Sequence, residues 1–332
     1  MRALLHRRAV LVGLIVGVPL SAVFLWLALR NANLDAVWSA LTAVDVGFVV
    51  LAVVAIAGVY LGQAVRWRAI ARTPTVSTAR FGEMVVSGVA VNDVLPGRIG
   101  DLLRARWLQV AARIPGGRAL ATVIVDRAFD VLALVVFLAI SLPFVASAEW
   151  LRRIAVGGLV LLVLLGLVLV AARIYVRSRD RKRRGHRGLV RRLVRDTLEG
   201  LADPIGRRRG AILVGISLAT WAMWALAAWL VARSVGIELS AMEAIFVTAV
   251  INLGVAVPSS PGFIGTYQWL CVSALALFDV RASEALAFSI LMHAVWYVPT
   301  LLVGGALLLR RAVGAARTAP AQHASLLEAP DG

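Results

Sequence analysis

Most of this chain consists of apolar stretches that are about as long as a bilayer is thick. The stretch 46–65, for example, contains no charged side chain. A helix needs about 20 predominantly apolar residues to cross the hydrocarbon core of a membrane. Hydrophobic residues make up 61% of the chain, and its mean hydropathy is +0.86. The sequence therefore predicts an all-α integral membrane protein.

We expect a single polytopic membrane domain over residues 1–311 with six full transmembrane helices. The first of them is longer than the apolar core of a secretory signal, which spans about 7–15 residues, so we expect a retained anchor. From residue 312 the chain is rich in Ala, Pro and polar residues without apolar periodicity, and we expect 312–332 to be a disordered cytoplasmic tail. The predicted membrane-spanning ranges are 9–29, 46–65, 122–145, 154–172, 211–232 and 285–309.

Two further apolar segments, 81–112 and 241–278, are too long for one crossing and are broken near their middles. Residues 96–100 and 261–265 both read Pro-Gly-x-Ile-Gly. Proline and glycine interrupt the helical hydrogen bonds, and freed backbone groups are tolerated in a bilayer only where protein or a water-filled cavity satisfies them. Many transporters place their substrate between two such broken segments. We therefore expect two re-entrant hairpins that together form the site.

The basic residues predict the orientation. The formal net charge is +17, and the Lys and Arg lie mainly in loops, above all in 177–209. Such loops stay in the cytoplasm, which places both termini there too. Apolar residues on one helical face of 189–201 predict an interfacial helix on anionic lipid or, equally, a solvated helix. With this orientation the hairpins enter from opposite sides, so the segments 46–145 and 211–309 would be inverted repeats.

The first hairpin concentrates charge at membrane depth, where ionisable residues are costly and mark a functional site by default. Asp101 and Arg104 are spaced i,i+3, and a helix that starts near Arg98 presents unpaired amides and the positive end of its dipole. The glycines permit close approach of a ligand. Together these features suit an anion such as a phosphate head group. The alternative is that Asp101 and Arg104 simply pair with each other at a helix end.

The span 122–145 carries a second charged group. Asp126 and Asp130 share one helical face, and Arg127 is spaced i,i+3 from Asp130. These side chains should face the interior of the bundle. They either lock this span to the first hairpin as an ion-pair network or line the substrate path, and the two roles are compatible.

The second hairpin offers neutral hydrogen-bonding groups, and His293 is the only histidine inside a predicted span. A lone histidine among apolar neighbours belongs more often to a hydrogen-bonded core than to a proton path. The candidate substrate-binding residues of both halves are Asn92, Asp93, Pro96, Gly97, Arg98, Gly100, Asp101, Arg104, Asp126, Arg127, Asp130, Asn252, Ser259, Ser260, Gly262, Gly265, Gln268 and His293.

These motifs resemble the lysylphosphatidylglycerol synthase transmembrane, or flippase-like, family over about residues 10–310. The resemblance is carried by Asn92 with the run 95–104, by Asp126, Arg127 and Asp130, and by the run 261–265. It implies a bacterial or archaeal inner-membrane protein that translocates lipid. We expect no synthase activity, because no soluble domain follows residue 312. Gln268 stands where members of the family often have a carboxylate.

The leading hypothesis is thus a flippase in the bacterial inner membrane for an anionic amphipathic lipid, either a phospholipid or a polyprenyl-phosphate-linked sugar. We expect no cofactor and no enzyme activity, because the four histidines are scattered, Cys271 is the only cysteine, and no phosphate-cradling loop is present. The aromatics lie within spans and not beside the basic runs, which excludes nucleic acid. The alternatives are a membrane enzyme acting on lipid phosphates or lipid-linked sugars, with a divalent ion held by aspartates, and a scaffold that partners a cell-envelope glycosyltransferase.

Overall fold

The structure is a computed structural model, and it describes residues 18–95, 98–145, 197, 206–255 and 260–327. Within these ranges every regular element is a helix, as predicted. The predicted span 154–172, the first half of 9–29 and all of the predicted interfacial helix 189–201 except residue 197 lie outside the described residues. The remainder of the first span forms an apolar helix, Val18–Leu29.

Long apolar helices form the body of the protein. By length and composition, five described segments can cross a membrane: α3 (Val46–Ala71), α6 (Gly116–Val145), α9 (Arg207–Ser234), Pro261–Phe278, and the Ala282–Val313 part of α12. Each of the five carries exposed apolar side chains, such as Val54 of α3 and Phe144 of α6, which suit contact with lipid tails. Four of the five correspond to predicted spans, extended by a few residues. The fifth lies within the second predicted hairpin.

The two broken segments have their breaks where the Pro-Gly motifs predicted them. The first consists of α4 (Thr78–Val94) and α5 (Ile99–Ala112). The second consists of α10 (Ala241–Gly254), the 3-10 turn η1 (Pro261–Phe263), α11 (Thr266–Leu275) and the 3-10 turn η2 (Ala276–Phe278). A short helix, α2 (Leu34–Thr42), precedes α3 and is capped by the Asn33 side chain.

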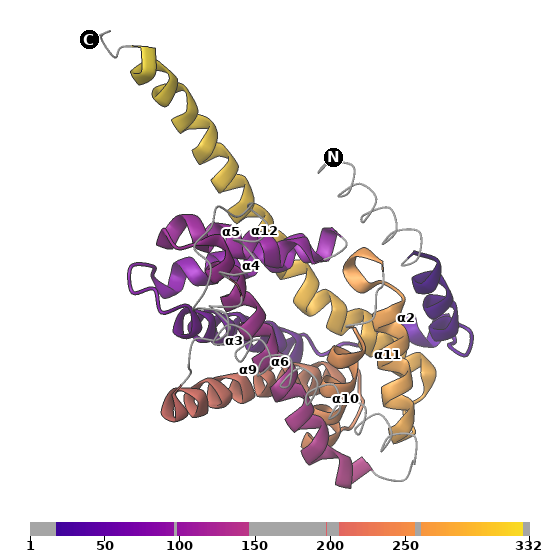
Figure 1. The fold of residues 1–332 in the computed structure, drawn as a ribbon. Helices are drawn as coiled ribbons and strands as arrows, with labels where there is room; N and C mark the ends of the chain where they lie inside the picture. Colours follow the sequence, from indigo (N-terminus) through magenta and orange to yellow (C-terminus); the bar gives the residue numbers. More distant parts are fainter. Residues whose placement is uncertain (1–17, 96–97, 146–196, 198–205, 256–259, 328–332) are drawn as a thin grey trace.

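The carboxyl-terminal helix differs from the sequence prediction. Helix α12 runs from Ala282 to Leu327 and projects beyond the other helices towards the carboxyl terminus (Figure 1). The sequence analysis expected disorder from residue 312, whereas the helix continues to Leu327; the tail as a separate disordered segment stays a prediction. The segment is rich in alanine, the residue with the highest helix propensity, and it continues a helix that is already formed, so no new nucleation is needed.

Contacts between helices come in matched sets (Figure 1). Helices α3 and α9 run side by side and share the most extensive contact. Around this pair, α4 packs on α12 and α10 packs on α6. Likewise α5 contacts α6, and α11 contacts α12. If α3 to α6 are matched in order with α9 to α12, each of these contacts has a counterpart in the other half.

Candidate functional site

The first break places Arg98 in an unusual backbone conformation. Arg98 immediately precedes α5 and has φ 53° and ψ 38°, in the left-handed region, and it is exposed. Asn92, in the last turn of α4, reaches across the break: its Oδ1 accepts the Gly100 N–H at 2.7 Å. One of the amides freed at the start of α5 is therefore satisfied by a side chain from the other arm.

The two arms of this segment touch backbone to backbone. A Cβ added to Gly100 would overlap the Gly88 carbonyl oxygen and lie 2.7 Å from Asn92 Oδ1. A Cβ on Gly88 would lie 2.7 Å from Arg104 Cδ. Both positions therefore require glycine, because any larger residue would push α5 away from α4.

Beside the break lies a cluster of three arginines and three aspartates, which we call the arginine–aspartate network; four of the six are buried, and Asp101 and Arg127 are partly exposed. At its centre is Arg66 of α3, which is fully buried. Arg66 Nε donates to Asp126 Oδ1 at 2.8 Å, and Nη2 donates to Asp130 Oδ1 at 2.7 Å. Nη1 donates to the Ser217 hydroxyl of α9 at 3.1 Å. One side chain thus connects α3, α6 and α9.

Two more arginines complete the network from α5 and α6. Arg104 donates to Asp126 Oδ2 at 3.0 Å and to Asp101 at 3.4 Å, and its guanidinium lies 4.3 Å from the centre of the Trp67 ring. Arg127 contacts Asp101 at 3.1 Å and Asp130 at 3.0 Å. The indole N–H of Trp221 also donates to Asp130, at 3.1 Å.

The network confirms two pairs that the spacing predicted, Asp101 with Arg104 and Arg127 with Asp130. It also joins the charged span to the first hairpin, as the structural interpretation of that span required. No ion pair among the described residues includes Arg98. Arg98 is therefore a cation of the first break without a direct ion pair, although Asp101 and Asp130 lie close enough to interact with it electrostatically.

The second break has a similar backbone but neutral chemistry. Phe263 occupies the position in its Pro-Gly-x-Ile-Gly motif that Arg98 occupies in the first, and it too is left-handed, with φ 59°. The Gly265 N–H donates to Gln268 Oε1 at 2.6 Å, and the Ser260 N–H donates to the Ser21 hydroxyl at 2.8 Å. Unlike Asn92 in the first break, Asn252 makes its hydrogen bond within its own helix: its side-chain amide donates to Thr248 O at 2.9 Å.

Gln268 also contacts His293 of α12. Gln268 Nε2 lies 3.0 Å from His293 Nδ1. The imidazole stacks on Trp296 with ring centres 5.0 Å apart, and the rings of Tyr267 and Tyr297 lie 5.0 and 5.1 Å away. His293 therefore joins the second break to α12 inside an aromatic cluster, an arrangement that suits the core interpretation.

The two breaks meet. Helix α4 contacts η1, and a Cβ added to Gly262 would lie 3.4 Å from the Asp93 carbonyl oxygen and 3.2 Å from the Tyr297 hydroxyl. Pro96, Gly97 and Ser259 lie outside the described residues. Two hairpins that form one site should bring Gly97 next to Gly262. That contact stays a prediction, although Asp93, from the same break as Gly97, lies next to Gly262.

The sequence prediction missed Arg66, because its span ended at residue 65 and an arginine at that point normally marks a membrane surface. The sequence nevertheless contained a signal that Arg66 faces the interior of the bundle. Ile56, Val59, Gln63 and Arg66 follow one another at helical spacing, and all four side chains are buried. The helix continues to Ala71 and carries the arginine into the bundle.

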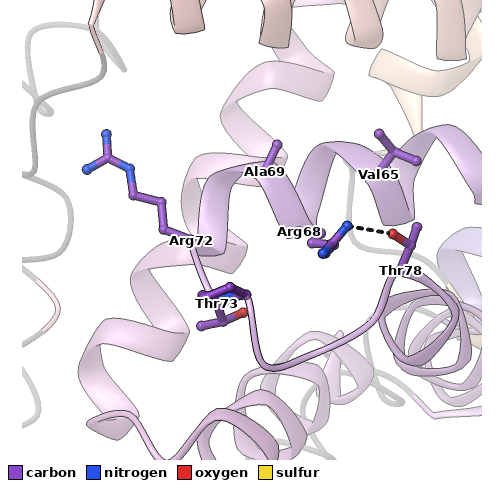
Figure 2. A pocket seen from close by; sticks show the side chains of 7 residues that line it. Val65, Arg68, Ala69, Arg72, Thr73 and Thr78 are labelled. Carbon is purple, nitrogen blue, oxygen red and sulfur yellow. Dashed lines mark hydrogen bonds between the residues drawn. The ribbon is translucent and has the colours of Figure 1, made fainter.

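A cavity of about 460 Å³ lies apart from the breaks, at the carboxyl end of α3 (Figure 2). Val65 and Ala69 form an apolar part of its lining. Arg68 donates to Thr78 Oγ1 at 3.1 Å and to Val76 O at 3.2 Å, so it fixes the turn between α3 and α4. Among the described residues, no group of three or more His, Cys, Asp and Glu is placed to hold a metal.

The fold and the site define a multi-pass α-helical membrane protein with two broken segments that meet at a polar centre. Comparison with known proteins gives the family: residues 10–304 match the lysylphosphatidylglycerol synthase TM region, and the chain belongs to this family.

Two curated relatives cover much of the chain. A UPF0104 membrane protein of Methanocaldococcus jannaschii is 22% identical over 222 residues, which are 64% of this chain and 91% of that protein. The glycosyltransferase AglD of Haloferax volcanii is 28% identical over 256 residues, 64% of this chain but only 40% of AglD.

Proposed function

We propose that this protein translocates an anionic amphipathic lipid, a phospholipid or a polyprenyl-phosphate-linked lipid, across the bacterial inner membrane. The observation that carries the proposal is Arg98. It is exposed at a helix start in a broken membrane segment, while every arginine of the buried network is matched by aspartates. A guanidinium at the start of a helix, where the helix dipole has its positive end, favours a phosphate.

A repeat of two halves supports a shared site. The helix contacts of one half have counterparts in the other, and both motifs place a left-handed residue at the same position, Arg98 and Phe263. We infer that the halves are inverted repeats and that α4–α5 and α10–α11 re-enter from opposite sides, with both termini in the cytoplasm. The head group would then pass between a cationic break and a neutral one while the acyl chains stay in lipid.

The same geometry argues against the metal-dependent enzyme. Asp101, Asp126 and Asp130 are committed to arginines at 2.7–3.4 Å, which removes them as ligands for a divalent ion. These ion pairs support a transporter over the metal-dependent enzyme. The family membership and the AglD relative keep a cell-envelope enzyme as a possible partner, and the experiment below includes that outcome.

The test compares Arg98→Ala with Arg113→Ala in vesicles. Arg113 is a matched control: it is an exposed, left-handed arginine (φ 53°) at the opposite end of α5, away from the break. Purified protein is placed in phosphatidylcholine vesicles with fluorescent phosphatidylglycerol or a fluorescent polyprenyl phosphate. Dithionite then quenches the label in the outer leaflet. We expect the wild type and Arg113→Ala to increase the quenched fraction above that of empty vesicles.

Arg98→Ala should return the quenched fraction to the level of empty vesicles, with its yield and thermal stability unchanged, and Arg98→Lys should retain part of the activity. Normal quenching with Arg98→Ala would remove this residue from the site. Chemical conversion of the lipid in a metal-dependent manner, detected by mass spectrometry, would support the enzyme instead. A co-purifying glycosyltransferase together with full tolerance of Arg98→Ala would support the scaffold.

A further inference from the structure

One buried carboxylate stands apart from the others. Asp93 lies in the last turn of α4, directly before the first break, and is 2% exposed. Its Oδ2 has no hydrogen-bond partner among the described residues, and none of their ion pairs includes it. Asp101, Asp126 and Asp130, in contrast, each contact at least two arginines. Among the described residues near the breaks, Asp93 is therefore the acid that no cation compensates.

The groups around Asp93 cannot neutralise it. Tyr60 of α3 and Tyr297 of α12 are the titratable side chains that interact with it electrostatically. Neither tyrosine is a cation in any protonation state. The Tyr60 hydroxyl is already hydrogen-bonded to Thr300 Oγ1 at 2.5 Å. An ionised carboxylate without a partner is too costly in such a place, and the group takes up a proton instead.

The position of Asp93 connects its charge to the contact between the two breaks. Its own carbonyl oxygen faces Gly262, whose added Cβ would lie 3.4 Å away, so α4 and η1 are closely packed at this point. A neutral acid is compatible with that packing. A carboxylate requires water, which a side chain that is only 2% exposed does not meet.

We propose that Asp93 is a proton-binding site whose protonation closes the contact between the breaks and whose deprotonation opens it, so that a proton gradient drives lipid movement. The coupling rests on the translocase function proposed above. In each cycle one proton moves from water on one side to the Asp93 carboxylate and leaves to water on the other side. No bond to the lipid is made or broken.

Infrared spectroscopy tests the proton site without any lipid substrate. The full-length protein is measured at neutral pH in a maltoside detergent, which has no ester carbonyl that would overlap the carbonyl stretch of a protonated carboxylic acid. We expect the wild type to show this band, Asp93→Asn to lose it, and Asp93→Glu to retain it. Asp35→Asn, at an exposed position of α2, should leave it unchanged. A band that is missing from the wild type, or unchanged in Asp93→Asn, would overturn the proposal.

Transport under a pH gradient tests the coupling. In vesicles with fluorescent phosphatidylglycerol, a pH gradient across the membrane should accelerate lipid movement by the wild type when it is imposed in one direction but not in the other. A protonophore should abolish the acceleration. Asp93→Asn, which cannot release a proton and so keeps the closed state, should show no acceleration by the gradient. A wild type that moves lipid but ignores the gradient overturns the coupling alone. A wild type that moves none of the anionic lipids tested overturns the translocase, while the infrared result still decides the proton site.

Discussion

At the scale of single residues, Arg66 determines whether the buried charges are compensated. Replacing it with leucine leaves Asp126 with Arg104 alone and Asp130 with Arg127 and Trp221. Breaking a buried ion pair by removing one partner costs about 3–5 kcal/mol. We expect Arg66→Leu to show a large drop in melting temperature, measured by tryptophan fluorescence in detergent.

The control for this change is Arg80→Leu. Arg80 pairs with Glu83 at 2.5 Å on an exposed part of α4. Exposed ion pairs contribute little to stability, so the melting temperature should barely change. Equal losses in the two variants would mean that the Arg66 contacts do not hold the bundle together.

The site was predictable from sequence as far as its charges follow local spacing. Asp101 with Arg104 and Arg127 with Asp130 are i,i+3 pairs, which helical geometry alone brings together. The contact of Arg127 with Asp101, by contrast, joins two different helices, and so does each contact of Arg66. Such contacts depend on how helices pack, which one sequence does not specify. The sequence therefore indicated which groups carry the charge but not which of them cancel.

At the scale of elements, the contact between α4 and α5 depends on the absence of two side chains. Gly100→Ala would drive a methyl group into the Gly88 carbonyl and against Asn92, forcing the arms of the hairpin apart. Overpacking of this kind typically costs about 1–3 kcal/mol. We expect Gly100→Ala to lower the melting temperature and to reduce lipid movement, both measured on the same purified sample.

Gly215→Ala is the matched control for that substitution. Gly215 lies within α9, and a Cβ there would meet no atom within 4 Å. Since alanine has a higher helix propensity than glycine, the melting temperature of Gly215→Ala should stay the same or rise. A stable Gly100→Ala protein with normal transport would show that the hairpin does not need its close backbone contact.

The helices themselves were largely predictable, because long apolar runs with Pro-Gly breaks leave few alternatives in a membrane. The segment that begins with α4 starts at Thr78, where Ser77 caps it, and the one that begins with α10 starts at Ala241, where Ser240 and Glu243 form a capping box. The predicted ends of α3 and α12 were too early, because hydropathy marks the apolar part of a helix and not where its hydrogen bonds stop.

At the scale of the whole molecule, the two halves form one site only if their breaks remain in contact. Gly262→Ala and Gly236→Ala provide a matched pair, because both glycines have positive φ, 70° and 78°, and alanine strains the backbone at each. Only at Gly262 would the new Cβ lie 3.2 Å from Tyr297 and close to Asp93; at Gly236 it would meet nothing within 4 Å.

We therefore expect Gly262→Ala to slow lipid movement far more than Gly236→Ala, with the difference measured in the dithionite assay. Thermal stability, recorded in parallel, separates loss of the fold from loss of the site. Equal transport by the two variants would indicate that the packing of η1 against α4 has no part in translocation.

The balance of the arginine–aspartate network also determines how the protein responds to voltage. Its three arginines and three aspartates have formal charges that sum to zero, although they lie among membrane-spanning helices. A membrane potential does work only on net charge that moves across it. If α3, α5 and α6, which carry the network, shift together as a rigid body, the network adds no gating charge. Any dependence of transport on membrane voltage would then report the charge of the lipid, Arg98 and the coupled proton, and its steepness would count the charges moved in each cycle.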